Sequence, residues 1–288
     1  MDYALEVKGL SKTYKKSGFT LDNVSFTVPK GTIVGLVGEN GAGKSTTIGC
    51  ILNTIFRDRG EVKLLGQEMR DEDTQLRQRI GVVYDGDNFP GYYTAEQLAE
   101  VMRRAYQQWD DSLFEKYLLK FGLDRKQKIK TYSKGMTMKL AIGTALAHKP
   151  ELLILDEATS GLDPVMREEM LEIFLEFIEN ENHSILLSSH ITSDLEKIAD
   201  YITFLHEGKV ILTVEKDEIL YRYGIIRCKD GEFEALDEED RIAWQKRAYQ
   251  IDVLVPDREK AARKYKGAVI DHASIDEVML LLTKGERI

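Results

Sequence analysis

The amino-acid sequence predicts an α/β fold built on a parallel sheet that is covered on both faces. Five short runs of apolar and β-branched residues have the length and uniform apolarity of strands buried in such a sheet. These runs are residues 33–37, 80–83, 152–155, 185–187 and 201–205. Helical patterns follow several of them, at residues 44–53, 164–180 and 192–199. This alternation of strand and helix is typical of α/β proteins.

A helical subdomain is expected to interrupt this alternation at about residues 90–148. The pattern predicts one helix throughout residues 94–121, which begins with the capping-box sequence Thr94-Ala95-Glu96-Gln97. A second helix is predicted at residues 137–148, after the lysine-rich stretch 126–130. The sheet is therefore expected to resume only after residue 150.

The composition changes near residues 216–223, where shorter elements begin. They are predicted at residues 225–228, 236–244, 249–255, 257–265, 268–272 and 274–283, and the last begins with the capping-box sequence Ser274-Ile275-Asp276-Glu277. We therefore expect a main domain at residues 1–218 and a small C-terminal α/β accessory domain at residues 219–288.

Charge and composition narrow the classes of function. The 288 residues contain 49 acidic and 40 basic side chains, a formal net charge of −9, and a field of this sign repels nucleic-acid backbones. The two cysteines, Cys50 and Cys228, lack metal-ligand spacing, which favours a reducing compartment. No signal peptide is visible, and no apolar run approaches the roughly 20 residues that span a bilayer. We therefore expect a cytoplasmic protein.

Residues 38–45 form a phosphate-binding motif. They read Gly-Glu-Asn-Gly-Ala-Gly-Lys-Ser, which matches G-x-x-x-x-G-K-[ST] between a predicted strand and a predicted helix. The glycines let the backbone N–H groups turn toward an anion, and the helix N-terminus adds partial positive charge. Lys44 is expected to reach the β- and γ-phosphates, and the Ser45 hydroxyl to bind Mg²⁺.

Two acidic residues follow the predicted strand at residues 152–155. Asp156 and Glu157 are expected at the carboxyl end of the sheet, where α/β proteins bind ligands. Asp156 is predicted to hold Mg²⁺, and Glu157 to polarise the water that attacks the γ-phosphate. The alternative, that two acids merely end a strand, is less favoured because of the upstream phosphate motif.

Residues 131–136, Thr-Tyr-Ser-Lys-Gly-Met, precede this acidic pair and are expected to lead into a helix at about Thr137. They resemble the signature motif of ABC-type ATPases, whose usual form is Leu-Ser-Gly-Gly-Gln. Ser133 and Gly135 match that form, whereas Tyr132, Lys134 and Met136 depart from it.

Further motifs extend the resemblance from about residue 5 to residue 214, in the order that the family has them. Residues 160–163, Ser-Gly-Leu-Asp, resemble the D-loop. His190 occupies the place of the switch histidine, and Tyr14 that of the aromatic residue that stacks on adenine. The alternatives are a core histidine and an ordinary aromatic residue at the end of a strand.

The resemblance implies a P-loop NTPase core of ABC type. It implies an N-terminal antiparallel β subdomain, an inserted helical subdomain and a small C-terminal α/β appendage. It further implies that Glu157 and His190 are catalytic and that ATP and Mg²⁺ are bound. The implied nucleotide-binding residues are Tyr14, Gly38, Asn40, Gly41, Gly43, Lys44, Ser45, Thr46, Ser133 and Gly135.

One position departs from the family in a way that bears on the metal. The family has a glutamine after the strand that here is predicted at residues 80–83, and this chain has Asp85 there. An aspartate can still bind Mg²⁺ through water, but it is shorter than glutamine and charged. The predicted metal ligands are therefore Ser45, Asp85 and Asp156, and slow hydrolysis without a partner is expected.

The resemblance also implies partners. Two ATP-binding subunits, identical or merely similar, are expected to sandwich ATP, with Ser133 and Gly135 acting on the nucleotide of the opposite subunit. A separate integral membrane permease is expected to hold the protein at the inner face of the membrane. Its docking groove would include the aromatic loop at residues 85–93, unless that loop packs on the helix at 94–121.

The C-terminal segment resembles the tails of ATPases that serve ABC-2 type exporters, and the chain is too short for the large β-rich domain typical of sugar-importer ATPases. An exporter is therefore favoured. Two alternatives stay open. One is a soluble ABC ATPase acting on ribosomes or DNA, although such proteins carry two cassettes or a long coiled coil. The other is a nucleotide-sensing module with low activity.

Overall fold

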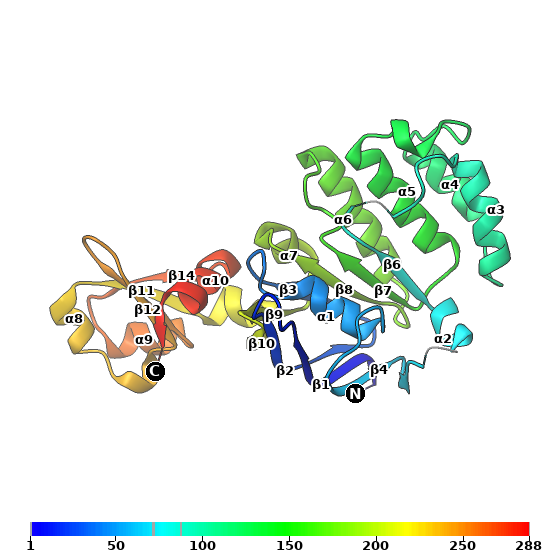
Figure 1. The fold of residues 1–288 in the computed structure, drawn as a ribbon. Coiled ribbons are helices and arrows are strands. Elements are labelled where there is room, and N and C mark those ends of the chain that lie inside the picture. Colours follow the sequence, from blue (N-terminus) through cyan, green and yellow to red (C-terminus); the bar gives the residue numbers. More distant parts are fainter. Residues whose placement is uncertain (1, 71–72, 87, 288) are drawn as a thin grey trace.

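The computed structural model describes residues 2–70, 73–86 and 88–287. A six-stranded sheet in the order β10-β9-β3-β8-β7-β6 forms its centre (Figure 1). Its strands are β3 (Ile33–Val37), β6 (Ile80–Val83), β7 (Leu152–Asp156), β8 (Ser184–Ser189), β9 (Tyr201–His206) and β10 (Lys209–Glu215). All neighbours pair in parallel except β10, which is antiparallel to β9. The five predicted strands and the α/β class are confirmed.

The register of this sheet brings three loops to one edge. Val37 pairs with Ser189, and Asp156 pairs with Ser188. Because the three strands β3, β7 and β8 run in parallel, the residues that follow them emerge side by side at their carboxyl ends. The phosphate motif, Glu157 and His190 therefore belong to one site.

A second sheet, in the order β2-β1-β4-β5, is antiparallel and covers one face of the central sheet. Its strands are β1 (Tyr3–Thr13), β2 (Thr20–Pro29), β4 (Arg59–Leu64) and β5 (Gln67–Glu68). Helix α1 (Lys44–Ile51) lies between the sheets, since Ile48 shares an apolar cluster with Leu5 of β1 and Leu36 of β3. This confirms the antiparallel N-terminal sheet that the resemblance implied.

Helices α6 (Pro164–Ile178) and α7 (Thr192–Ile198) cover the opposite face. Asp163 caps α6 by accepting hydrogen bonds from the N–H groups of Val165 and Met166, and Pro164 occupies the first helical position, where its missing N–H costs nothing.

The helical subdomain contains α3 (Ala95–Ala105), α4 (Asp111–Lys120), a 3₁₀ turn (Ile129–Thr131) and α5 (Lys134–Ala147), after the short α2 (Thr74–Gln78). The capping box at Thr94 is present. The prediction of one helix throughout residues 94–121 was wrong. The Gln78 side chain donates to Ala105 O and accepts from Gln107 N, both at 2.8 Å. Gln78 thus pairs with the backbone C=O of Ala105 and the N–H of Gln107, which would have formed helical hydrogen bonds if α3 had continued.

A further sheet, in the order β14-β11-β13-β12-β15, forms a C-terminal unit after a π-helical turn (Glu218–Arg222). Its strands are β11 (Gly224–Cys228), β12 (Ala243–Lys246), β13 (Ile251–Val255), β14 (Val269–His272) and β15 (Glu286–Arg287). Its helices are α8 (Asp230–Glu234), α9 (Arg258–Lys264) and α10 (Ile275–Lys284), with a 3₁₀ turn at Glu238–Asp240. The sequence predicted neither α8 nor the 3₁₀ turn.

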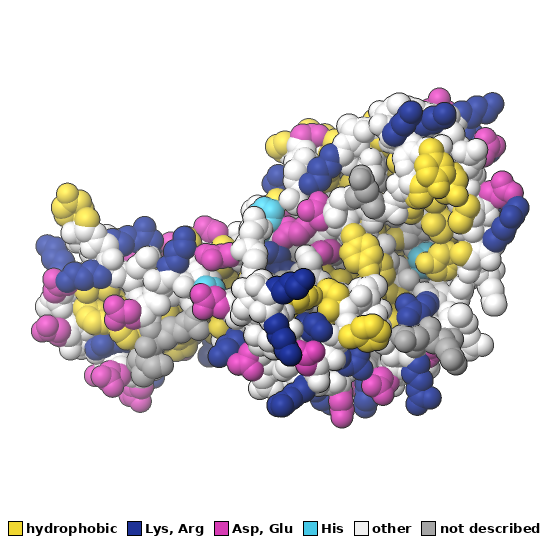
Figure 2. Space-filling view, viewed as in Figure 1, with side chains coloured by type: hydrophobic (Ala, Val, Ile, Leu, Met, Phe, Trp, Pro, Cys, Tyr) yellow, Lys and Arg dark blue, Asp and Glu magenta, His cyan; other side chains and the backbone are white. Residues whose placement is uncertain are grey.

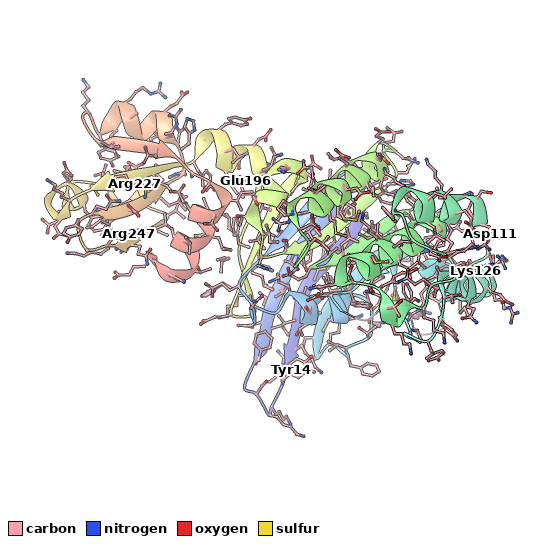
Figure 3. The ribbon with its side chains drawn as sticks, turned by 90° about the horizontal axis from the view of Figure 1, so that it is seen from above. Tyr14, Asp111, Lys126, Glu196, Arg227 and Arg247 are labelled. Carbon is pink, nitrogen blue, oxygen red and sulfur yellow. The ribbon has the colours of Figure 1, made fainter. Side chains whose placement is uncertain are left out.

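Helix α10 joins this unit to the core. Ile275 and Val278 belong to the same apolar cluster as Leu195 and Ile198 of α7, and Ile275 N donates to Glu196 Oε1 at 3.0 Å. Figure 3 shows Glu196 where the C-terminal unit meets the core. Because the apolar cluster is continuous, the domain boundary near residue 218 stays a prediction. Among the described residues, no helix combines the length and apolarity needed to cross a membrane.

Candidate functional site

The loop between β3 and α1 has a backbone that requires glycine. Gly41 and Gly43 have φ values of 87° and 111°, in the left-handed region that disfavours other residues. A Cβ atom at Gly38 would lie 2.4 Å from Leu205 O, so this position also excludes a side chain. The sequence motif therefore folds into the tight loop, followed by a helix N-terminus, that it predicts.

Lys44, the first residue of α1, is 5% exposed. Its Nζ donates to Gly38 O at 2.7 Å and to Glu39 O at 3.3 Å. The same Nζ lies 3.0 Å from Glu157 Oε1. These contacts hold the ammonium group inside the loop, where it contributes a fixed positive charge.

Asp156 is the last residue of β7 and Glu157 follows it, and both contact Ser188 of β8. Ser188 Oγ donates to Asp156 Oδ1 at 2.6 Å, and Glu157 N donates to Ser188 Oγ at 3.1 Å. Glu157 has a φ of 53°, an uncommon conformation for a residue with a long side chain. Strained backbone of this kind is concentrated at functional sites, and here it directs the Glu157 carboxylate toward Lys44.

His190 follows β8 and lies on the other side of Glu157. Its Nδ1 is 2.7 Å from Glu157 Oε2, and 40% of its side chain is exposed. Because a carboxylate can only accept, the hydrogen on Nδ1 is donated to Glu157. Lys44, Glu157 and His190 therefore form one continuous chain of contacts.

A cavity of about 500 Å³ opens above this chain of contacts. Its lining comprises Tyr14, Ser17, Phe19, Glu39, Asn40, Gly41, Gly43, Lys44, Ser45, Thr46, Asp85 and Glu157. Tyr14 follows β1 and lies near the turn of the β1–β2 hairpin (Figure 3). The ring centroids of Tyr14 and Phe19 are 6.5 Å apart, so two aromatic side chains stand together in the lining of the cavity.

The predicted magnesium ligands do not form one cluster. Ser45 and Asp85 line the cavity, and Asp156 is fixed by Ser188. Hydroxyl and carboxylate oxygens are the donors that Mg²⁺ prefers, so Ser45 and Asp156 fit the ion. Asp85 is instead paired with Lys134, its Oδ1 3.1 Å from Nζ.

The signature residues lie at the N-terminus of α5. Ser133 caps the helix by accepting from Met136 N at 3.2 Å, and a Cβ at Gly135 would collide with Met166 at 2.3 Å. The helix begins at Lys134, three residues before the predicted start at Thr137, because Ser133 provides the cap. Neither Ser133 nor Gly135 is among the described residues that line this chain's own cavity.

Comparison with known proteins gives consistent matches. The family model described as ABC transporter matches residues 21–160. The bacitracin transport ATP-binding protein BcrA of Enterococcus faecalis is 34% identical over 241 residues, which are 82% of this chain and 78% of that protein. The lantibiotic transport ATP-binding protein SrtF of Streptococcus pyogenes is 35% identical over 219 residues, 74% of this chain and 91% of that protein.

This chain belongs to the ABC transporter ATP-binding proteins. A solved structure of an ATP-binding subunit of an ABC transporter agrees, with a TM-score of 0.68 and 32% identity over 75% of this chain and 91% of that chain. The ABC transporter family confirms the predicted fold class and the binding of ATP.

Three residues at this ABC transporter site were missed by sequence reasoning. Phe19 lines the cavity beside Tyr14, Ser188 contacts both Asp156 and Glu157, and Lys134 pairs with Asp85. A signal existed for Ser188, since it directly follows the predicted strand at residues 185–187 and precedes His190 by two residues. Phe19 and Lys134 are brought to the site by tertiary contacts that have no local pattern.

Proposed function

We propose that this ABC transporter ATPase hydrolyses Mg-ATP in the cavity above Lys44 and so drives a separate membrane permease. The observation that carries the proposal is the contact chain of Lys44, Glu157 and His190, with Glu157 Oε1 3.0 Å from Lys44 Nζ and Oε2 2.7 Å from His190 Nδ1. This contact chain supports the proposal because Lys44 would serve as the phosphate-binding cation, Glu157 as the general base and His190 as the histidine that orients it.

Each residue of the site has a role in ATP binding or hydrolysis that follows from its position. Lys44 and the N–H groups of the glycine loop hold the phosphates, and Tyr14 stacks on the adenine. Ser45 and Asp156 would hold Mg²⁺, which when bound neutralises phosphate charge. Glu157 accepts a proton from the attacking water, and His190 orients the Glu157 carboxylate. The water oxygen attacks the γ-phosphorus, the bond to the ADP oxygen breaks, and ADP and phosphate are released.

Dimerisation is part of the proposal. Ser133 caps α5 and the helix N-terminus is a ready anion site, but Ser133 and Gly135 are absent from the described lining of this chain's own cavity. For these residues to meet a nucleotide, it must be the nucleotide of a second ATP-binding subunit. ATP would then hold two subunits together until hydrolysis.

The permease would dock on the hydrophobic face near the helical subdomain. Figure 2 shows hydrophobic side chains gathered there. Tyr92 of the loop at residues 85–93 is 67% exposed, and Tyr84 just before the loop is also exposed, whereas Phe89 and Tyr93 pack against the core. The loop thus combines the two predicted behaviours, self-packing and an exposed apolar surface, and such a surface is typical of a protein contact.

Export is the favoured direction, because the similar proteins are assigned to bacitracin and lantibiotic transport. The subunit would then lie at the inner face of the cell membrane, held there by the permease. The contacts that choose the cargo belong to the permease chain.

Co-purification tests this function. Tagged Glu157→Gln protein, expressed at native level, would be recovered from membranes in mild detergent with Mg-ATP. We expect an integral membrane protein with several spans in stoichiometric amount. Recovery from the soluble fraction, with ribosomes or DNA-binding proteins, would instead favour a soluble ABC ATPase.

A further inference from the structure

Two departures from the family pattern meet in space. Asp85 replaces the usual glutamine, and Lys134 replaces the first glycine of the usual signature motif. They are 49 residues apart in sequence, yet Lys134 Nζ lies 3.1 Å from Asp85 Oδ1. Each departure adds one charge, and the two charges are opposite. The contact therefore explains both unusual residues at once.

The position of Lys134 makes this pairing more than a surface contact. Lys134 is the first residue of α5, where a cation is disfavoured by the partial positive charge of the helix N-terminus. The Asp85 carboxylate offsets that charge. A helix of the inserted subdomain is thus tied to a residue that lines the nucleotide cavity.

The residues around Asp85 and Lys134 keep the two side chains close together. Asn88 Oδ1 accepts from Tyr84 N at 3.0 Å, and Asn88 Nδ2 donates to Gly86 O at 3.0 Å, which fixes the turn that carries Asp85. On the other side, Lys134 lies close to Gly161 of the D-loop, where an added Cβ would be 3.1 Å from Nζ. Lys134 is therefore ion-paired with Asp85 and lies near the D-loop.

We propose that Lys134 is a positioning residue that keeps Asp85 away from the nucleotide's metal, and that bound Mg-nucleotide opens this ion pair by drawing Asp85 to Mg²⁺. The inference rests on the proposed function of the cavity. Side-chain exposures of 51% for Lys134 and 45% for Asp85 make the pair weak enough to be exchanged. Its opening releases Lys134, at the N-terminus of α5, from Asp85, so the helical subdomain senses whether Mg-nucleotide is present.

The test is a double-mutant cycle read by binding and not by turnover. The dissociation constant of a non-hydrolysable ATP analogue is measured with Mg²⁺ and with EDTA, and the ratio of the two gives the Mg²⁺ effect. Lys134→Met frees Asp85, so the Mg²⁺ effect should rise roughly two- to fivefold, the range of an exposed ion pair. In an Asp85→Asn background, Lys134→Met should leave it unchanged.

Two control variants test whether the effect in the double-mutant cycle depends on the charge at position 134. Lys134→Arg keeps the positive charge and should behave as the wild type. Lys130→Met removes an exposed lysine close to the signature motif and should leave the Mg²⁺ effect unchanged, which separates pairing from a general loss of charge.

The possible results distinguish a failure of the Asp85–Lys134 proposal from a failure of the proposed nucleotide site. An equal change for Lys134→Met in the wild-type and Asp85→Asn backgrounds, or no change in either, overturns the proposal. Lys44→Ala is measured alongside and should abolish binding. If Lys44→Ala binds the analogue as tightly as the wild type, the nucleotide site itself is wrongly placed.

Discussion

The carboxylate of Glu157 lies 3.0 Å from the ammonium group of Lys44. The residue proposed to activate water is thus ion-paired with the residue proposed to hold the phosphates. Both side chains are largely buried, so neither charge can simply be left without a partner. Phosphate binding must therefore take Lys44 from Glu157, which frees the carboxylate for its catalytic role when substrate is present.

Replacement of Glu157 by glutamine should separate binding from turnover. The amide keeps the shape but cannot accept the proton of water, so ATP hydrolysis should fall by about 10²–10⁴-fold. ATP affinity should be retained or increased, because a competing negative charge is removed from Lys44. Steady-state hydrolysis and equilibrium binding measure the two effects.

Glu39→Gln, which removes a charge from the same cavity, should retain turnover within about tenfold of the wild type. Hydrolysis by Glu157→Gln at the wild-type rate would exclude Glu157 as the base.

Tyr14 should contribute to recognition of the base and not of the phosphates. Tyr14→Ala should weaken ATP binding by about 1–3 kcal/mol, the typical cost of losing a stacking aromatic, whereas Tyr14→Phe should bind normally. Affinity for inorganic triphosphate should be the same in all three proteins. Equal weakening toward ATP and triphosphate would show that Tyr14 acts on the loop structure instead.

His190 should act on turnover through Glu157. His190→Gln removes the ring that lies 2.7 Å from Glu157 Oε2, so hydrolysis should fall by at least about tenfold while ATP binding changes little. The measurement is a comparison of single-turnover hydrolysis with equilibrium binding. A His190→Gln protein that loses affinity and keeps its single-turnover rate would contradict this role.

The C-terminal unit should lose stability in acid through Asp240. Lys264 and Tyr265 lower the pKa of this buried carboxyl from 3.8 to about 2. A depressed folded-state pKa stabilises the fold above the unfolded value, and this contribution is lost as the pH falls from about 4 through about 2. Unfolding followed by Trp244 fluorescence in a Trp109→Phe background should show this loss. Asp240→Asn should remove it, and Glu239→Gln, at an exposed neighbour, should not. An acid-stability profile unchanged by Asp240→Asn would exclude this group as the cause.

Local sequence signals predicted the parts of the site that are local in structure. The run at residues 33–37 became β3 with the expected bounds, because five successive apolar residues between turn signals fit a strand buried on both faces. The phosphate loop, Asp156 and Glu157 lie where expected, since each is located at the carboxyl end of a predicted strand.

Contacts between distant segments could not be predicted in the same way. The end of α3 depends on Gln78, which is 27 residues from Ala105, and no glycine or proline marks it. The pairing of Asp85 with Lys134 likewise needs the helical subdomain folded against the core. In the predicted element at residues 236–244, the strand β12 begins only at Ala243. The preceding residues Glu238–Asp240 form a 3₁₀ turn instead, and Asp240 accepts a hydrogen bond from Tyr265 at the end of α9.

ATP held at this site is expected to join two ATP-binding subunits, and the mass of Glu157→Gln protein in solution tests this most directly. Light scattering at saturating Mg-ATP should give about twice the monomer mass of 32.9 kDa, and monomer without nucleotide. The Lys44→Ala/Glu157→Gln double variant should stay monomeric under both conditions. A Glu157→Gln protein that binds Mg-ATP and remains a monomer would contradict the account.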